Sequence, residues 1–207
     1  ALLHAADPDG NPATPDHAQV INLSLGTTTP TKLLDKVVEL VTCSDDDDGE
    51  DDDDYSDPGF NRDRERCDLH HGSVVTAAAG NGGNARELQY PAAERAEGAL
   101  SVAASTAASR VASFSNRGPW VMIAAPGEGL TSTVPGGGYA VWSGTSMAAP
   151  LAAGIAALLR AHQPDWKPVD VTQRMQDRSA TLCGSGLRRV DARGALEDEV
   201  PPPTVCP

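Results

Sequence analysis

The central helix of this chain is predicted from the run Gly144-Thr145-Ser146-Met147-Ala148-Ala149-Pro150 and the residues after it. From Ser146 to Ala161 no charged side chain occurs before Arg160, and nearly every residue is Ala, Leu, Ile or Gly. This composition is typical of a helix that is buried on all sides. Pro150 lies only four residues after Ser146, so it falls in the first turn, where a missing amide donor costs least.

Ser146 stands at the start of this predicted helix. A hydroxyl there lies near unpaired backbone N–H groups and the positive end of the helix dipole, which both favour negative charge on a nearby oxygen. Such a position suits a nucleophile. The alternative is that Thr145 or Ser146 is simply the N-cap of the helix, the usual role of Ser and Thr at helix starts.

The remaining chain alternates short apolar runs with segments of helical periodicity. Residues 31–42 place five apolar side chains on one face of a helix, and another helix is expected over 169–177. The expected strands cover residues 20–25, 73–79, 100–104 and 121–125. Strands separated by helices predict an α/β fold in three layers, with a mostly parallel sheet covered by helices on both faces.

Two loops that contain glycine follow expected strands, Leu25-Gly26 and Gly80-Asn81-Gly82. In parallel sheets the functional residues lie beyond the carboxyl ends of the strands. Gly26 and Gly80 would let a substrate backbone approach closely, and Asn81 would offer an amide donor to an oxyanion. The alternative for Asn81 is an ordinary turn residue beside glycines.

Composition limits the functions that this chain can have. Its 207 residues, 40% of them hydrophobic, suit one domain with a substantial core. The net charge of −13 comes mainly from residues 44–57, which hold ten of the 29 acidic residues. The rest is nearly neutral and contains no run of 18 apolar residues, so we expect a monomer without a nucleic-acid partner or a membrane span.

Several blocks of the sequence resemble those of the subtilisin-like serine proteases, the subtilases of peptidase family S8, and occur in that family's order. The blocks are Ile21-Asn22-Leu23-Ser24-Leu25-Gly26, Ala77-Ala78-Ala79-Gly80-Asn81, Tyr90-Pro91-Ala92-Ala93, Ser113-Phe114-Ser115-Asn116-Arg117-Gly118-Pro119, Ala125-Pro126-Gly127, Gly144 to Pro150 and Gly186-Leu187-Arg188-Arg189-Val190-Asp191-Ala192. The resemblance implies a partial subtilisin-like catalytic domain over residues 1–196, with an acidic loop insertion at 44–66 and a Pro-rich tail at 197–207.

The resemblance also implies roles for individual residues. Ser146 would be the nucleophile of a serine endopeptidase, and the Asn81 side chain would hold the oxyanion together with the Ser146 N–H. Gln89 would lie near the floor of the pocket for the substrate residue before the cut. Two backbone edges would grip an extended polypeptide substrate, formed by Ser24, Leu25 and Gly26 and by Ala78, Ala79 and Gly80.

The family's aspartate and histidine have no counterpart in this chain. In the subtilisin order they precede the serine, yet no His-Gly-Thr-His block occurs, and none of the five histidines fits the motif (His4, His17, His70, His71 and His162). The sequence begins at Ala1 with residues typical of the last turns of a helix, which favours an N-terminal truncation. The alternative is a non-catalytic, peptide-binding pseudoprotease. In either case we expect residues 1–207 alone to be inactive.

Four cysteines bracket two irregular segments. Three pairings are possible, and we favour Cys43 with Cys67 and Cys183 with Cys206 because each bond would staple one such segment. Two disulfides imply an oxidising compartment, so we expect a secreted protein. Four reduced thiols in a cytosolic protein are the alternative.

The acidic loop raises the question of a bound ion. Runs of like charge are usually disordered and solvated, and we expect this here. Structural calcium is the alternative that the resemblance suggests. An EF-hand loop with Gly49 as its glycine would need acidic residues at positions 44 and 55, but the chain has Ser44 and Tyr55 there. We expect no metal or cofactor in the chemistry itself.

Overall fold

A computed structural model describes residues 1–44, 66–94, 96–201, 204 and 206 of the chain. Its centre is a sheet in which the first strands along the chain are parallel neighbours, as the sequence predicts. The strand at one edge, residues 180–181, runs antiparallel to its neighbour. In spatial order the strands are β1 (Val20–Leu23), β2 (Val74–Ala78), β3 (Ala99–Ser105), β4 (Ile123–Pro126), β8 (Arg188–Arg189) and β7 (Ala180–Thr181).

Strands β2 and β3 are buried along their whole length, as expected for apolar runs in the middle of a parallel sheet. Alternate side chains enter two different clusters. Val102 and Ala78 belong to the cluster under the central helix, whereas Ala77 and Ala103 belong to a cluster on the other face. Both faces are therefore covered, and the strands are held in one register.

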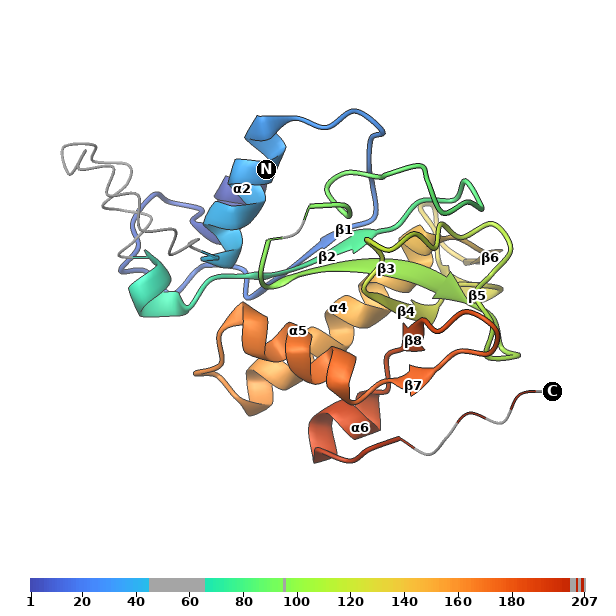
Figure 1. Ribbon diagram of the computed structural model, residues 1–207. Helices are drawn as coiled ribbons and strands as arrows, with labels where there is room; N and C mark the ends of the chain where they lie inside the picture. The colour runs from blue at the N-terminus through green and yellow to red at the C-terminus, as the bar shows by residue number, and fades with distance from the viewer. Residues whose placement is uncertain (45–65, 95, 202–203, 205, 207) are drawn as a thin grey trace.

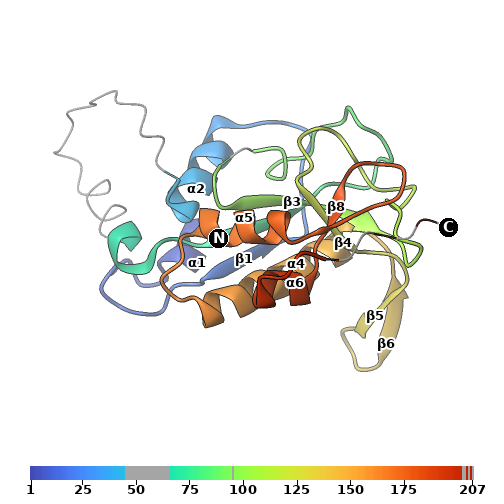
Figure 2. The same ribbon diagram turned by 60° about the horizontal axis from the view of Figure 1, so that its bottom comes forward.

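Helices cover both faces of this sheet (Figure 1). Three lie on one face, α4 (Thr145–His162), α5 (Pro168–Asp177) and α6 (Ala192–Glu197), and Figure 2 shows α2 (Lys32–Thr42) on the opposite side. The short α1 (Leu2–Ala6) packs with α2, since Ala6 and Val38 share a buried cluster with Val75 of β2. The three-layer α/β fold predicted from the sequence is confirmed.

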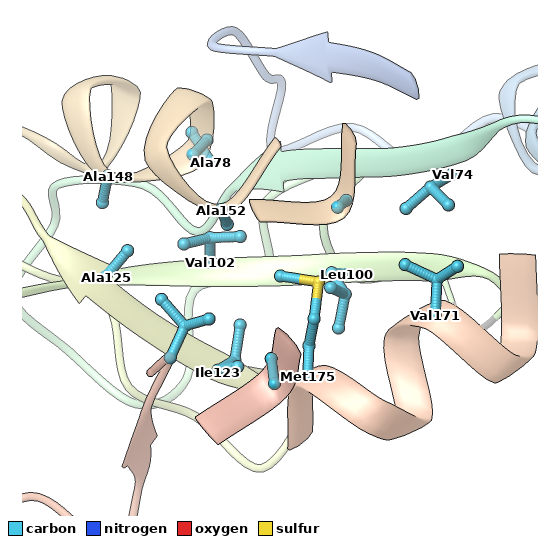
Figure 3. Close-up of a cluster of buried hydrophobic side chains, with 14 of the residues drawn as sticks. Val74, Ala78, Leu100, Val102, Ile123, Ala125, Ala148, Ala152, Val171 and Met175 are labelled. Atoms are coloured by element: carbon cyan, nitrogen blue, oxygen red, sulfur yellow. The ribbon is translucent and has the colours of Figure 1, made fainter. Parts of the chain in front are cut away.

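Small side chains let α4 lie close to the sheet. Figure 3 shows Ala148 and Ala152 of α4 facing Ala125 and Val102, and all four are completely buried. Close packing of this kind brings the start of α4 to the carboxyl ends of β1 and β2.

The prediction that α4 is buried on all sides is wrong for the described chain. Its inner face is buried, but Pro150, Gly154 and Ala157 are exposed, as are Leu151 (42% exposed) and Leu158 (52%). These residues follow one another at helical spacing and form a continuous apolar stripe, which we call the outer face of α4. No described residue is placed to cover it.

The structure contains elements that the sequence did not predict. One is a hairpin of β5 (Leu130–Thr133) and β6 (Tyr139–Trp142), which projects from the body of the molecule (Figure 2). Tyr139 and Trp142 are mostly exposed on it. The others are the two-residue strands β7 and β8 and helix α6, all too short to give a periodic signal.

Both favoured disulfides are present. Cys43 bonds to Cys67 with a Cα–Cα distance of 5.6 Å, and Cys183 bonds to Cys206 at 5.7 Å. The second bond fixes part of the predicted Pro-rich tail to the loop after β7. Residues 45–65, which include the acidic run, lie outside the described residues.

Candidate active site

Ser146 lies in the first turn of α4, beside the carboxyl ends of β1 and β2. The N-cap of the helix is Gly144, without a side-chain cap, so neither Thr145 nor Ser146 takes the capping role considered as an alternative. The Ser146 N–H belongs to the first turn, where the helix itself offers no acceptor. The Ser146 N–H is therefore available to an outside acceptor.

Asn81 is held beside Ser146 by Thr145. The Asn81 Oδ1 accepts hydrogen bonds from the Thr145 N–H at 2.9 Å and from the Thr145 hydroxyl at 3.1 Å. Because a backbone N–H can only donate, Oδ1 must face Thr145, and the Nδ2 amide is left to donate elsewhere. The Thr145 hydroxyl in turn accepts from the Gly80 N–H at 3.1 Å, which ties the loop after β2 to α4.

Two amide nitrogens lie close to Gly144. A Cβ atom placed on Gly144 would lie 3.6 Å from the Asn81 Nδ2 and 3.7 Å from the Ser146 nitrogen. A side chain at this position would contact both nitrogens, so glycine leaves the space beside them unfilled. An oxygen that carries developing negative charge would find two N–H donors there.

The Ser146 hydroxyl is bonded to the main chain of the neighbouring loop. It donates to the Ser24 carbonyl at 3.1 Å, and the Ser24 hydroxyl donates to the Ser146 carbonyl at 2.7 Å. This reciprocal pair fixes the loop after β1 against the start of α4. The Ser146 hydroxyl must leave the Ser24 carbonyl before it can pass its proton to a base.

The two predicted substrate edges differ in what they can offer. Within the described chain, the backbone groups of Leu25 and Gly26 make no hydrogen bonds, and the Leu25 side chain is 66% exposed. The Ala79 and Gly80 backbone groups are all bonded internally, with both carbonyls bonded to Asn116. The 24–26 edge therefore offers free N–H and carbonyl groups to an extended peptide, whereas the 78–80 edge offers at Ala79 and Gly80 only the second lone pair of each carbonyl.

Gln89 lies between these two edges. Its side chain would come within 2.9 Å of a Cβ placed on Gly26 and within 2.8 Å of one placed on Gly80. Thr27 and Tyr90 bond to each other through their backbones and hold this loop beside the 24–26 edge. Gln89 thus adjoins both predicted edges, and its place near a pocket floor stays a prediction.

No histidine of the chain contacts Ser146. His17 and His70 stack on each other with ring centroids 4.0 Å apart. His162 lies in the last turn of α4, about 24 Å along the helix axis from Ser146. His4 lies in α1, and His71 lines a separate polar pocket beside the Cys43–Cys67 bond.

A groove of about 350 Å³ lies beside Ser146, between the β5–β6 hairpin and α4. The hairpin contributes Leu130 and Trp142 to its lining, and α4 contributes Met147 and Leu151. The groove continues onto the outer face of α4. Apolar surface that is not covered by described residues therefore begins directly beside the nucleophile candidate.

Metal binding and membrane insertion find no support in the described residues. Within them, no three acidic, His or Cys side chains are grouped so that they could hold a metal ion. The acidic run that could be a calcium site is outside that part of the chain. None of the helices there has the length and apolarity needed to cross a membrane.

Comparison with known proteins identifies the family. The sequence profile of the Subtilase family matches residues 5–194. The chain is 34% identical over 186 residues to the Thermophilic serine proteinase of Bacillus sp. (strain AK1), covering 90% of this chain and 36% of that protein. It is also 34% identical over 178 residues to Subtilisin BL of Lederbergia lenta, covering 84% of this chain and 55% of that protein.

Solved structures show the same fold. A protease from Pseudoalteromonas arctica PAMC 21717 superposes with a TM-score of 0.69 at 27% identity, over 95% of this chain and 56% of that one. The self-cleaved protease domain of PatA superposes with a TM-score of 0.68 at 26% identity, over 94% of this chain and 64% of that one. The chain thus spans between 36% and 55% of the length of the two curated relatives named above. Because the profile extends along nearly all of the chain and two relatives align over most of it, this protein belongs to the subtilase family.

Proposed function

We propose that the protein acts as a serine endopeptidase in which Ser146 is the nucleophile. The observation that carries this proposal is that the Asn81 amide nitrogen, left free by Thr145, and the Ser146 N–H both lie close to Gly144, at the start of the helix that carries the Ser146 hydroxyl. The unpaired Leu25-Gly26 backbone supports it, since it offers an extended substrate an edge to pair with. Polypeptide is accordingly the proposed substrate.

The reaction follows from these groups. The Ser146 oxygen attacks the carbonyl carbon of the scissile bond while a base takes the hydroxyl proton. The carbonyl oxygen becomes negative and is stabilised by the two N–H donors. The base then gives its proton to the leaving amine as the C–N bond breaks, and water hydrolyses the acyl-enzyme.

We propose that a histidine and an aspartate from outside these 207 residues supply the base. The outer face of α4 supports this, because it is apolar, begins at Ser146 and is not covered by described residues. Gly154 has no neighbour within 4 Å of an added Cβ, so another helix has room to approach closely there. The occupant would be the segment that carries the histidine.

The test compares the 207-residue chain with a longer form that includes the residues encoded before Ala1. We expect peptide hydrolysis only from the longer form. There, Ser146→Ala should lower kcat by roughly 10⁶-fold, and Asn81→Ala by roughly 10²- to 10³-fold. Both magnitudes are borrowed from a subtilisin, the enzyme in which they were measured.

Ser113→Ala is the matched control, because Ser113 is an exposed serine on another loop and should leave kcat unchanged. Turnover by the pure 207-residue chain that disappears in Ser146→Ala would show that no outside base is needed. The pseudoprotease alternative would instead be supported by a longer form that binds extended peptides without cleaving them.

We further propose that the protein works in an oxidising, extracellular compartment. The two disulfides support this, since such bonds persist mainly in secreted proteins. Intact mass measured on protein purified from the native source, with and without reductant, tests it. A mass showing four free thiols before reduction would place the protein in a reducing compartment.

A further inference from the structure

A histidine pair joins two segments that are far apart in the sequence. The rings of His17 and His70 stack at 4.0 Å with an angle of 25° between their planes. His70 Nε2 donates to the Pro12 carbonyl at 2.7 Å, so it anchors the turn-rich segment before β1. The His17 Nδ1 is buried and has no hydrogen-bond partner within the described chain.

The surroundings of this pair are rich in positive charge. Arg160 of α4 is almost completely buried and donates to the carbonyls of His70 (3.1 Å) and Gly72 (3.4 Å), and also to that of Trp166. It is bonded to carbonyl oxygens only, so its charge is not neutralised by a carboxylate among the described residues. A proton added to His17 would place a second cation near this buried guanidinium.

Most of the charged groups around His17 lower its pKa. Burial, followed by the positive charges of His70, Arg160 and Arg66, lowers the pKa of His17 below its ordinary value of 6.5. Asp16 acts in the opposite sense and is the weakest of these influences. Neutral His17 is thus favoured by the folded protein more than by the unfolded chain.

We propose that this stack is an acid-sensitive latch, which holds residues 8–17 against the 66–72 segment while the His17 ring is neutral and releases them when that ring gains a proton. Because the folded state disfavours the proton on His17, the stabilisation is complete above the ordinary imidazole pKa. It is lost as the pH falls below that value toward the lowered pKa.

The latch adjoins both elements that build the candidate active site. Ala18 and Gln19, which follow His17, accept hydrogen bonds from Ser73 and Val74 and lead directly into β1. Arg160 belongs to α4, the helix that begins at Ser146. Release of the segment at low pH would therefore free the amino end of β1, whose carboxyl end leads to Ser24. The latch itself does not depend on the proposed function.

Hydrogen exchange measured on the 207-residue chain tests the latch. The Ala18 N–H bonds to the Ala5 carbonyl of α1, so its protection reports whether the chain directly after His17 stays docked on the body of the protein. After correction for intrinsic rates, its protection should fall on acidification by about tenfold for each unit by which the His17 pKa lies below its ordinary value. The His17 pKa itself is read from the C2–H resonance in an NMR titration.

Two variants and a control complete the experiment. His17→Phe keeps a ring to stack on His70 but cannot gain a proton, so Ala18 protection should stay high at low pH. His17→Gln should remove both the stack and the pH dependence, leaving low protection at every pH. His162→Gln changes an exposed histidine and should behave like the wild type. The proposal is overturned if His17 titrates at the ordinary value, or if His17→Phe loses protection on acidification as the wild type does.

Discussion

The two faces of helix α4 are built from nearly the same residue types but have opposite surroundings. On the inner face, Ala152, Ala156 and Leu159 are 0–1% exposed and pack on the sheet. On the outer face, Leu151 and Leu158 are about half exposed. Hydrophobic residues show which surfaces a sequence is able to bury, but burial itself requires a second layer. In the described chain that layer exists on one side of α4 only.

The sharpest test of this contrast makes the same substitution at two adjacent residues, one on each face of α4. Ala156→Asp would bury an unpaired charge under the sheet and should cost about 4 kcal/mol of unfolding free energy or more. Ala157→Asp points to the outer face and should cost only about 0.5 kcal/mol, the difference in helix propensity. Urea unfolding of the 207-residue chain measures both. Equal losses would mean that the two faces are not different in solution.

A second pair of variants examines what covers the outer face. Leu159→Ala should cost about 2–5 kcal/mol, because it leaves a cavity in the core, whereas Leu158→Ala should cost less than about 1 kcal/mol. In a longer form that contains the proposed histidine segment, the cost of Leu158→Ala should rise toward that of Leu159→Ala. The docking proposal fails if Leu158→Ala stays nearly neutral there while the longer form is folded.

The smallest expected effect on the free energy of unfolding comes from Glu94, on the other side of the sheet, where α2 meets the 90–94 loop. Burial, a hydrogen bond with Asp35 and the negative charges of Asp35 and Glu39 raise the pKa of Glu94 to about 7 from its ordinary 4.5. A carboxyl whose folded pKa is raised stabilises the fold below its unfolded pKa, and this contribution is lost as the pH rises through about 7.

Glu94→Gln should therefore raise the unfolding free energy above pH 7, by about 1 kcal/mol once solvent screening is allowed for. It should change little near pH 4.5. Glu97→Gln, which alters a nearby acid on the same connection, serves as the control. Denaturant titrations at several pH values measure the difference. A gain that is the same at all pH values would contradict the raised pKa of Glu94.

Much of the fold could be predicted from local sequence patterns. Residues 31–42 formed a helix within one residue of the expected bounds, since Thr31 caps it by accepting from the Leu34 N–H. The apolar runs at 73–79 and 100–104 became the central strands β2 and β3. The β5–β6 hairpin was not predicted, because its apolar side chains are largely exposed and its strands have only four residues each.

The candidate site was predicted in part. The motifs pointed to Ser146 and Asn81, but not to Thr145, whose N–H and hydroxyl orient the Asn81 amide. They also did not distinguish the 24–26 edge from the 78–80 edge. That difference depends on Asn116, which bonds to the Ala79 and Gly80 carbonyls from 36 or more residues away.

The sequence by itself determined the family, the order of strands and helices and the identity of the nucleophile candidate, because these are expressed in periodicity and in contiguous motifs. Only the tertiary structure determined which groups share a hydrogen bond and which apolar surface stays uncovered. Three contacts join residues more than 50 positions apart: the Thr145–Asn81 bond that orients the amide, the Ser24–Ser146 bonds and the His17–His70 stack. Contacts at such separations arise from packing of the layers, and no local pattern encodes them.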